Sequence, residues 1–331
     1  MQRLFTAQVK TTSIAIQKAV KSPMITRSIT SSSQLFNVAT PRVPSKILVA
    51  HLDSAGTIVD PFCSLPLQLL KRVFDDRGIA VPTDVITKYM GLKKIDHVRQ
   101  ILLNVSQDWQ AKFKRAHNEQ DIKVIYAELE ALMLKFAGQS EFTKLTPHTE
   151  EFIQDFQKRG IVMTLTSGYP QAIGKLAVSK FREFYPDSPC TFSDEVTQGT
   201  RSEMIMQNMK KLSCKQPALL GQSVFFTDAK SDLNCVHKSL AHNKPWLVGV
   251  SDWSTHVGVY NTQEAFSLSP EALAARRAYA AQMLASAHLV IPDMSHAVAA
   301  VNVIEDAMAK GATPDNTQKL TFNECINRPR L

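Results

Sequence analysis

Four polar residues at the ends of short apolar runs are the first candidates for chemistry in this chain of 331 residues. Asp53, Ser167 and Asp228 each end or follow such a run, and Asp232 comes four residues after Asp228. One such residue alone is weak evidence, because polar residues often form turns there. Together, a carboxylate, a hydroxyl and a carboxylate pair suit phosphoryl transfer. Asp53 and Asp228 then offer hard oxygen ligands to Mg²⁺, and Ser167 donates to phosphoryl oxygens.

The residue two places after Asp53 restricts that chemistry. It is Ala55, so no acid stands there to protonate a departing alcohol. A hydrolase that cleaves phosphorus from carbon needs a different device, because a carbanion leaves only when an electron sink is attached. A protonated imine on a lysine supplies such a sink.

Two adjacent lysines are candidates for that imine. Lys93 and Lys94 both lie three or four residues from Met90 and His97, so helical spacing does not choose between them. The plain alternative is that this pair begins a basic, solvated helix.

An alternation of strands and helices must position these residues. Buried strands are predicted by five short apolar runs, at 47–53, 161–165, 224–227, 246–250 and 289–291. Residues 61–146 contain no convincing strand. They show helical periods at 67–77, 95–103 and 122–136. Helices are also expected at 149–158, 170–181 and 295–308. The pattern predicts an α/β protein with a Rossmann-like parallel sheet, covered on both faces, and an inserted helical cap over the strand ends.

We therefore expect four parts. Residues 1–45 form a targeting peptide or a disordered basic tail, 46–60 and 147–310 the α/β core, 61–146 the cap, and 311–331 a loose tail. Residues 1–46 carry seven basic residues and no acid, which is typical of a mitochondrial import peptide. The matrix is the expected compartment and the cytoplasm the alternative.

Composition excludes several other classes. The net charge of +8 comes mostly from the first 46 residues, and the rest is close to neutral, so nucleic acid is not an expected partner. No apolar run approaches the ~20 residues of a membrane-spanning helix. Five widely spaced cysteines without a CxxC pair argue against disulfides or zinc.

Several motifs together resemble the phosphonoacetaldehyde hydrolase family of the haloacid dehalogenase superfamily over about residues 47–308. They are Asp53–Asp60 (DSAGTIVD), Met90–His97 (MGLKKIDH), Ser167-Gly168-Tyr169 and Asp228–Asp232. The resemblance implies hydrolysis of phosphonoacetaldehyde to acetaldehyde and phosphate, with Mg²⁺ as cofactor, a small phosphonate as substrate and a homodimer as the assembly.

The same resemblance assigns roles. Asp53 is the nucleophile and Lys94 the imine lysine, since only the family register selects Lys94 over Lys93. The residues that surround the imine are Met90, His97, Cys63 and Tyr169. Those that bind the phosphoryl group are Ser167, Gly168 and Arg201. Those that hold the metal are Asp53, Ala55 through its carbonyl, Asp228 and Asp232.

Some positions depart from the family pattern. Trp is common where Ser54 stands, Gly where Thr227 stands, and the basic residue directly follows a Gly, whereas Thr200 separates Gly199 from Arg201 here. His51 in the first strand is also unusual, because it would be buried. A phosphatase acting on another small metabolite and a non-catalytic relative therefore stay open as alternatives.

Overall fold

The computed structural model describes residues 46–212 and 217–321. The expected targeting segment, 1–45, and the last ten residues of the expected tail lie outside these ranges. Within them, no helix is both long and apolar enough to cross a membrane.

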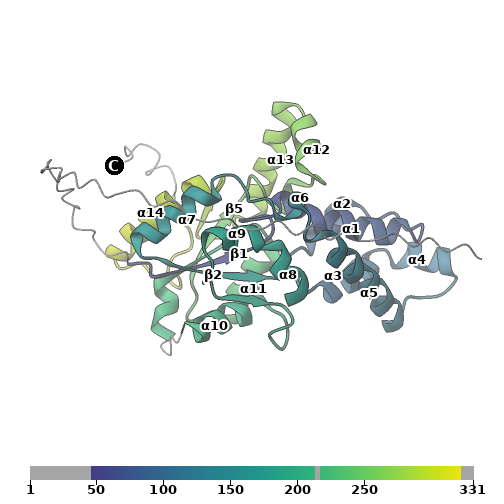
Figure 1. The fold of residues 1–331 in the computed structure, drawn as a ribbon, viewed down its shortest axis with the longest axis horizontal. Coiled ribbons are helices and arrows are strands. Elements are labelled where there is room, and N and C mark those ends of the chain that lie inside the picture. Colours follow the sequence, from purple (N-terminus) through teal and green to yellow (C-terminus); the bar gives the residue numbers. More distant parts are fainter. Residues whose placement is uncertain (1–45, 213–216, 322–331) are drawn as a thin grey trace, which may run out of the picture. The chain divides into compact units, whose positions relative to one another are not determined.

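A six-stranded, wholly parallel sheet forms the centre of the fold (Figure 1). The strand order is β3-β2-β1-β4-β5-β6. The strands are β1 (Val49–Asp53), β2 (Val162–Ser167), β3 (Cys190–Phe192), β4 (Ser223–Thr227), β5 (Trp246–Val250) and β6 (Leu289–Ile291). The predicted α/β class with a parallel sheet is confirmed.

The register of the three central strands brings the predicted residues together. Asp53 at the end of β1 is opposite Thr166 of β2, and Leu52 is opposite Phe226 of β4. Ser167 and Asp228 therefore follow at the same edge of the sheet, beside Asp53. Because all strands are parallel, their carboxyl ends share one edge, which is where ligands bind in such folds.

Helices cover both faces of the sheet, which explains why its strands are buried along almost their whole length. Helices α7 (Thr149–Arg159) and α14 (Ala297–Ala309) pack against the face formed by Ala50, Leu52 and Phe226. Helices α10 (Arg201–Lys211) and α11 (Lys230–Ser239) pack against the other face, around Val49 and Phe225. Figure 1 shows the two layers on opposite sides of the strands.

A buried hydrogen-bond network explains the unusual histidine of β1. His51 Nδ1 lies 2.8 Å from Thr164 Oγ1 in β2, and Asn208 Nδ2 of α10 donates to Thr164 Oγ1 (3.3 Å) and to the Leu165 carbonyl (2.6 Å). Thr191 Oγ1 in β3 donates to Asn208 Oδ1 at 2.7 Å. Burial lowers the pKa of His51 to about 3, so the imidazole is neutral. The network ties three strands to one helix beneath the site.

Residues 61–146, between β1 and α7, are helical and have their own core. Their helices are η1 (Pro61–Cys63), α1 (Ser64–Asp75), α2 (Thr83–Lys88), α3 (Lys94–Asn104), α4 (Ser106–Phe113), α5 (Glu119–Phe136) and α6 (Ser140–Thr143). Apolar residues of α1, α3 and α5, among them Phe74, Ile101 and Leu129, form a cluster separate from the sheet core. Three of these helices occupy the ranges that the sequence predicts.

Several elements lie where the sequence analysis proposed none, namely β3, α10, α11, η2 (Pro217–Gln222), η3 (Thr255–Val257), α12 (Thr262–Ser267), α13 (Pro270–Met283) and η4 (Met294–His296). The single helix expected at 170–181 is wrong: it is two helices, α8 (Gln171–Ala177) and α9 (Ser179–Phe184), which break at Val178 where φ is −90° and ψ is 8°. Past α14, Leu320 N donates to the His288 carbonyl at 2.7 Å, so this part of the expected tail is held against β6.

Candidate active site

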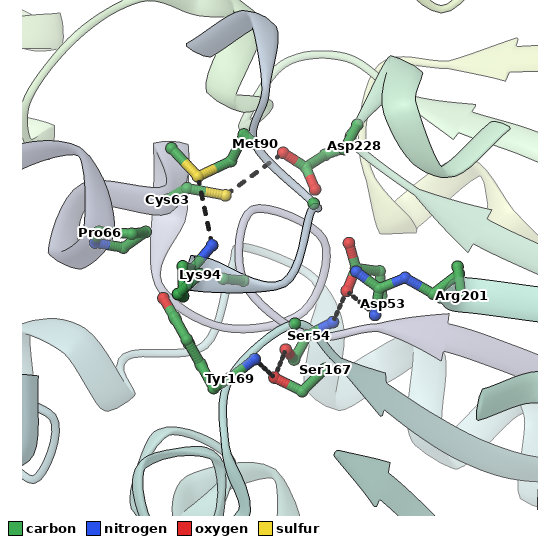
Figure 2. Close-up of a pocket in the computed structure, with 14 residues that line it drawn as sticks. Asp53, Ser54, Cys63, Pro66, Met90, Lys94, Ser167, Tyr169, Arg201 and Asp228 are labelled. Atoms are coloured by element: carbon green, nitrogen blue, oxygen red, sulfur yellow. Dashed lines mark hydrogen bonds and ion pairs between the residues drawn. The ribbon is translucent and has the colours of Figure 1, made fainter. Parts of the chain in front are cut away.

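A small enclosed cavity at the carboxyl edge of the sheet collects ten of the twelve residues predicted for the site (Figure 2). The two that do not line it are His97 and Asp232. The lining residues are Asp53, Ser54, Ala55, Cys63, Pro66, Met90, Gly91, Lys94, Ser167, Gly168, Tyr169, Arg201, Asp228 and Ala229. They come from the ends of β1, β2 and β4 and from the helical segment above them.

Arg201 is the cation that the carboxylates share. Its guanidinium lies 3.0 Å from Asp53 Oδ1 and 2.8 Å from Asp232 Oδ2, and its side chain is only 2% exposed. Arg201 is the first residue of α10, and Thr200 before it caps that helix by accepting from Glu203 N while Glu203 reaches back to Thr200 N. The extra residue between Gly199 and Arg201 is therefore the helix cap, and Arg201 still reaches the site.

Asp228 is held by donors from three directions. Thr255 N donates to its Oδ2 at 2.9 Å, Thr57 Oγ1 to its Oδ1 at 3.4 Å, and the Cys63 thiol to its Oδ2 at 3.5 Å. Burial, together with repulsion from Asp232, raises the pKa of Asp228 to about 7. Burial also raises the pKa of Asp53 well above its ordinary value, against the opposing effect of Arg201.

These raised pKa values bear on whether a metal fits. Asp53, Asp228 and Asp232 are buried with a single cation, Arg201, so the carboxylates exceed the positive charge among them. In the described ranges no group of three His, Cys, Asp or Glu side chains is placed to hold a metal ion by itself. Mg²⁺ typically needs only one or two carboxylates, together with waters and a substrate phosphate. The donor set of Asp53, Asp228 and the Ala55 carbonyl fits that requirement.

Gly56 allows the turn after Asp53 to pass beside Asp228. Its φ of +77° is a left-handed conformation, and a Cβ there would collide with the Asp228 carboxylate and come within 2.9 Å of Cys63 Sγ. Only glycine satisfies both conditions. The turn thereby brings Ala55 and Asp228 to the same small space.

Ser54 and Thr227, two positions named above as departures, place hydroxyl groups around Asp53. Ser54 Oγ donates to Ser167 Oγ at 2.9 Å, and Ser54 N donates to Asp53 Oδ1 at 2.7 Å. Thr227 Oγ1 lies 3.4 Å from Asp53 Oδ2 and 3.2 Å from Asp232 Oδ2. The sequence analysis named both residues as departures but did not place them in the site.

Lys94 lies in an environment poor in polar partners. The side chain is 3% exposed, and its Nζ is 3.8 Å from Met90 Sδ and 5.4 Å from the centre of the Tyr169 ring. Burial lowers the pKa of Lys94, and the charge of Arg201 lowers it further. Figure 2 shows the amine across the cavity from Asp53. A neutral amine at this position could act as a nucleophile toward a carbonyl carbon.

The structure separates the two adjacent lysines. Lys94 is the first residue of α3 and lines the cavity, whereas Lys93 precedes the helix, is half-buried and places its aliphatic chain against Gly199. The helical spacing that left both open is thus resolved by the start of α3. Arg201 is a cation among the largest influences that lower the pKa of Lys94.

His97 and Tyr169 support the lysine side of the site differently. His97 does not line the cavity: its Nε2 lies 2.8 Å from the Ile86 carbonyl, and burial lowers its pKa to about 3. Tyr169 lines the cavity and donates from its hydroxyl to Asp60 Oδ2 at 3.4 Å. Asp60 also accepts from Ser64 Oγ and from Leu65 N, and burial raises its pKa to about 7. Asp60 belongs to a motif quoted above, but its role here went unpredicted.

The cavity is small. Its volume is about 20 Å³, which is room for about one water molecule. A substrate with a phosphoryl group and a carbon chain does not fit in this volume, so residues around the cavity must move before it enters.

The chain is similar in sequence to known phosphonoacetaldehyde hydrolases. No family model matches it. It is 26% identical over 280 residues to the phosphonoacetaldehyde hydrolase of Lysinibacillus sphaericus, which covers 82% of this chain and all of that protein. It is 30% identical over 257 residues to the bifunctional phosphonoacetaldehyde hydrolase/aminoethylphosphonate transaminase of Clostridioides difficile; the match spans 76% of this chain but only 39% of that longer protein.

A solved structure shows the same fold. A phosphonoacetaldehyde hydrolase like protein from Oleispira antarctica aligns with a TM-score of 0.72 and 23% identity, covering 83% of this chain and 99% of that one. The six-stranded parallel sheet with its helices is that of the haloacid dehalogenase hydrolases.

Proposed function

Because the chain has the haloacid dehalogenase fold and is a homologue of phosphonoacetaldehyde hydrolases, we propose that it hydrolyses the carbon–phosphorus bond of phosphonoacetaldehyde to give acetaldehyde and phosphate. The observation that carries the proposal is Lys94, a buried lysine with a lowered pKa in the same cavity as Asp53. No alcohol leaves in this reaction, which accords with the Ala55 that replaces an acid.

The reaction begins at the lysine. The neutral Lys94 amine attacks the aldehyde carbon, water leaves, and a protonated imine forms. An Asp53 carboxylate oxygen then attacks phosphorus, and the electrons of the carbon–phosphorus bond pass into the imine to give an enamine. Protonation at carbon and hydrolysis release acetaldehyde and restore Lys94. A second water cleaves the aspartyl phosphate and restores Asp53.

The residues on the sheet side bind the phosphoryl group and would hold the metal. Asp53, the Ala55 carbonyl and Asp228 are the proposed direct ligands of Mg²⁺, with Asp232 completing the carboxylate set. When bound, this ion reduces the repulsion between an anionic nucleophile and an anionic phosphorus centre. Ser167, the Gly168 amide and Arg201 are proposed to donate to the phosphoryl oxygens.

The residues on the helical side surround the imine. Met90, Cys63 and Tyr169 line the cavity near Lys94 and keep it apolar, which favours the neutral amine. His97 does not line the cavity, and burial together with the charge of Lys94 lowers the pKa of His97 to about 3, so its ring is neutral and adds no second positive charge beside the lysine. We further propose that residues 61–146 act as a cap whose closure excludes water from the imine, and that two copies form a homodimer, as the resemblance implies.

A trapping experiment tests the lysine chemistry. The purified chain is incubated with Mg²⁺ and phosphonoacetaldehyde, and acetaldehyde and phosphate are assayed. Borohydride is then added with substrate, because reduction turns a reversible imine into a stable amine, and the adduct is mapped by peptide mass spectrometry. The proposal expects both products and an adduct on Lys94. Release of phosphate from simple phosphate esters, without an adduct, would favour a phosphatase instead.

Residues 1–45 are proposed to direct the chain to mitochondria. The support is the acid-free basic composition, and it is independent of the site. Fusion of these residues to a fluorescent protein should give mitochondrial signal, and a fusion that stays in the cytoplasm would contradict the proposal.

A further inference from the structure

A second, much larger cavity adjoins the active site and is lined by cations. Its volume is about 770 Å³, against about 20 Å³ for the active-site cavity. It lies among α2, α11, η3 and α13, and its basic residues are Lys88, Lys230, Lys238 and Arg276. The acidic residue in its lining is Asp84. We call this cavity the basic vestibule.

The charges of the basic vestibule are not neutralised by neighbours. Within the described ranges, none of Lys88, Lys230, Lys238 and Arg276 forms an ion pair with a carboxylate. Arg276 donates to the Gly258 carbonyl at 2.8 Å, and Lys88 lies over the Tyr89 ring. By contrast, Arg201 in the active site forms ion pairs with two aspartates. A cluster of free cations in a concave surface attracts anions.

One turn separates the two cavities. Met90 and Gly91 line the active site, whereas their neighbours Tyr89 and Leu92 line the basic vestibule. On the other side of the partition, Ala229 lines the active site, and Lys230 and Ser231 line the vestibule. Ser231 Oγ donates to the Met90 carbonyl, which fastens the turn to the first turn of α11.

The partition is thin because of Gly91. Its φ is +95°, and a Cβ there would lie 2.5 Å from Ser231 Oγ and 2.7 Å from Asp232 Oδ1. The backbone of 89–92 thus passes directly over the carboxylate site with no side chain at that point. Movement of this single turn would join the two spaces.

We propose that the basic vestibule is the entry and exit chamber for a dianionic phosphoryl group, and that the turn at 89–92 is its gate. The inference rests on the proposed function for the identity of the substrate, a small phosphonate. The lysines attract the dianion from solution, and opening of the turn passes it to Arg201 and Ser167. Phosphate leaves by the same chamber.

The test removes the charge of the basic vestibule without touching the active site. Lys88→Gln, Lys230→Gln and Lys238→Gln are combined, and the matched control combines Lys123→Gln, Lys175→Gln and Lys310→Gln, which remove the same charge outside this cavity. The vestibule variant should lose about tenfold in kcat/KM at low ionic strength, with kcat within about twofold of the parent. The loss should disappear in about 0.5 M salt, where charges are screened within about 5 Å.

Binding of inorganic phosphate, measured by calorimetry at low ionic strength, gives an independent readout. The parent and the control variant should bind phosphate more tightly than the vestibule variant. If the parent does not cleave phosphonoacetaldehyde but this difference persists, the proposed function fails and the anion chamber stands. If the parent cleaves it and the vestibule variant matches the control in kcat/KM and in phosphate binding, the vestibule is overturned. Altered modulation by added phosphate, with kcat/KM unchanged in its absence, would indicate a regulatory anion site and overturn the entry role.

Discussion

The two sides of the active site handle charge in opposite ways. On the sheet side, Asp53 and Asp232 share Arg201, and Asp228 receives hydrogen bonds from Thr255, Thr57 and Cys63. On the helical side, Lys94 is equally buried, and its amine lies 3.8 Å from the Met90 thioether and 5.4 Å from the centre of the Tyr169 ring. The sheet side surrounds its carboxylates with polar partners, whereas the helical side surrounds the Lys94 amine with less polar groups.

The difference accords with the chemistry proposed for each side. A phosphoryl group carries its charge throughout the reaction, so the groups that bind it must themselves be charged and fixed. An amine forms an imine only when it is neutral, and a desolvating environment favours the neutral form. The two sides of one cavity can thus favour opposite states, charged groups on the sheet side and a neutral amine on the lysine side.

The largest expected effect tests the lysine side. Lys94→Arg keeps the positive charge but cannot form an imine, so acetaldehyde release should fall by at least about three orders of magnitude. Lys93→Arg is the matched control and should be mild, because Lys93 does not line the cavity. A Lys94→Arg enzyme that still releases acetaldehyde would remove the basis for contrasting the two sides.

The next effect tests the sheet side. Arg201→Met leaves Asp53 and Asp232 buried without their cation, which should lower the free energy of unfolding by about 3–5 kcal/mol. Arg72→Met, which removes an exposed pair with Asp76, should cost at most about 1 kcal/mol. Urea titrations with chelator present measure both. Equal losses in the two variants would mean that the buried pairing is not what stabilises this side.

Asp60 lies between the two sides and sharpens the comparison through pH. Its pKa is raised from 3.8 to about 7 in the folded protein, so the folded state binds the proton more tightly than the unfolded state. Its contribution to stability is therefore complete below about pH 4 and is lost as the pH rises toward 7, on the order of 3 kcal/mol. Asp60→Asn should flatten that part of the pH profile of unfolding, measured against the parent in the same buffers. A profile as steep as the parent's would assign the effect to other carboxyls.

The smallest effect introduces a polar partner on the lysine side. Met90→Gln places an amide oxygen where Met90 Sδ approaches Lys94, which stabilises the charged amine and raises its pKa. The acidic limb of the pH profile of kcat/KM should move to higher pH, and the rate near pH 7 should fall about tenfold, which is about one pKa unit. Met206→Gln, in a half-buried position away from the cavity, is the control. If the acidic limb of the pH profile does not shift, the lack of a polar partner near the Lys94 amine does not set the pKa of Lys94.

The sequence predicts the sheet side better than the lysine side, for a physical reason. Asp53, Ser167 and Asp228 end buried apolar runs, and the ends of parallel strands meet at one edge, so their proximity follows from pattern alone. Lys93 and Lys94 are separated by where α3 begins, which helical spacing does not reveal. The family register selects Lys94, and the structure supplies the start of the helix.

The position of Arg201 at the start of a helix can be predicted from the sequence. Thr200 and Glu203 form a capping box, a pattern that marks the first turn of a helix. This pattern predicts α10 and places Arg201 at its first residue, although no periodicity argument reveals which carboxylates it meets. The ion pairs with Asp53 and Asp232 depend on how α10 packs against the sheet, which is a tertiary property.

The bond between His51 and Thr164 joins residues 113 positions apart in the chain. Both strands that flank β1 come after the helical segment, so the centre of the sheet forms only when a long loop closes, which is entropically costly and slows folding. The helices of that segment contact one another locally. We expect α1, α3 and α5 to gain protection from hydrogen exchange earlier in refolding than β1, so that the strand bearing Asp53 is among the last elements to become ordered.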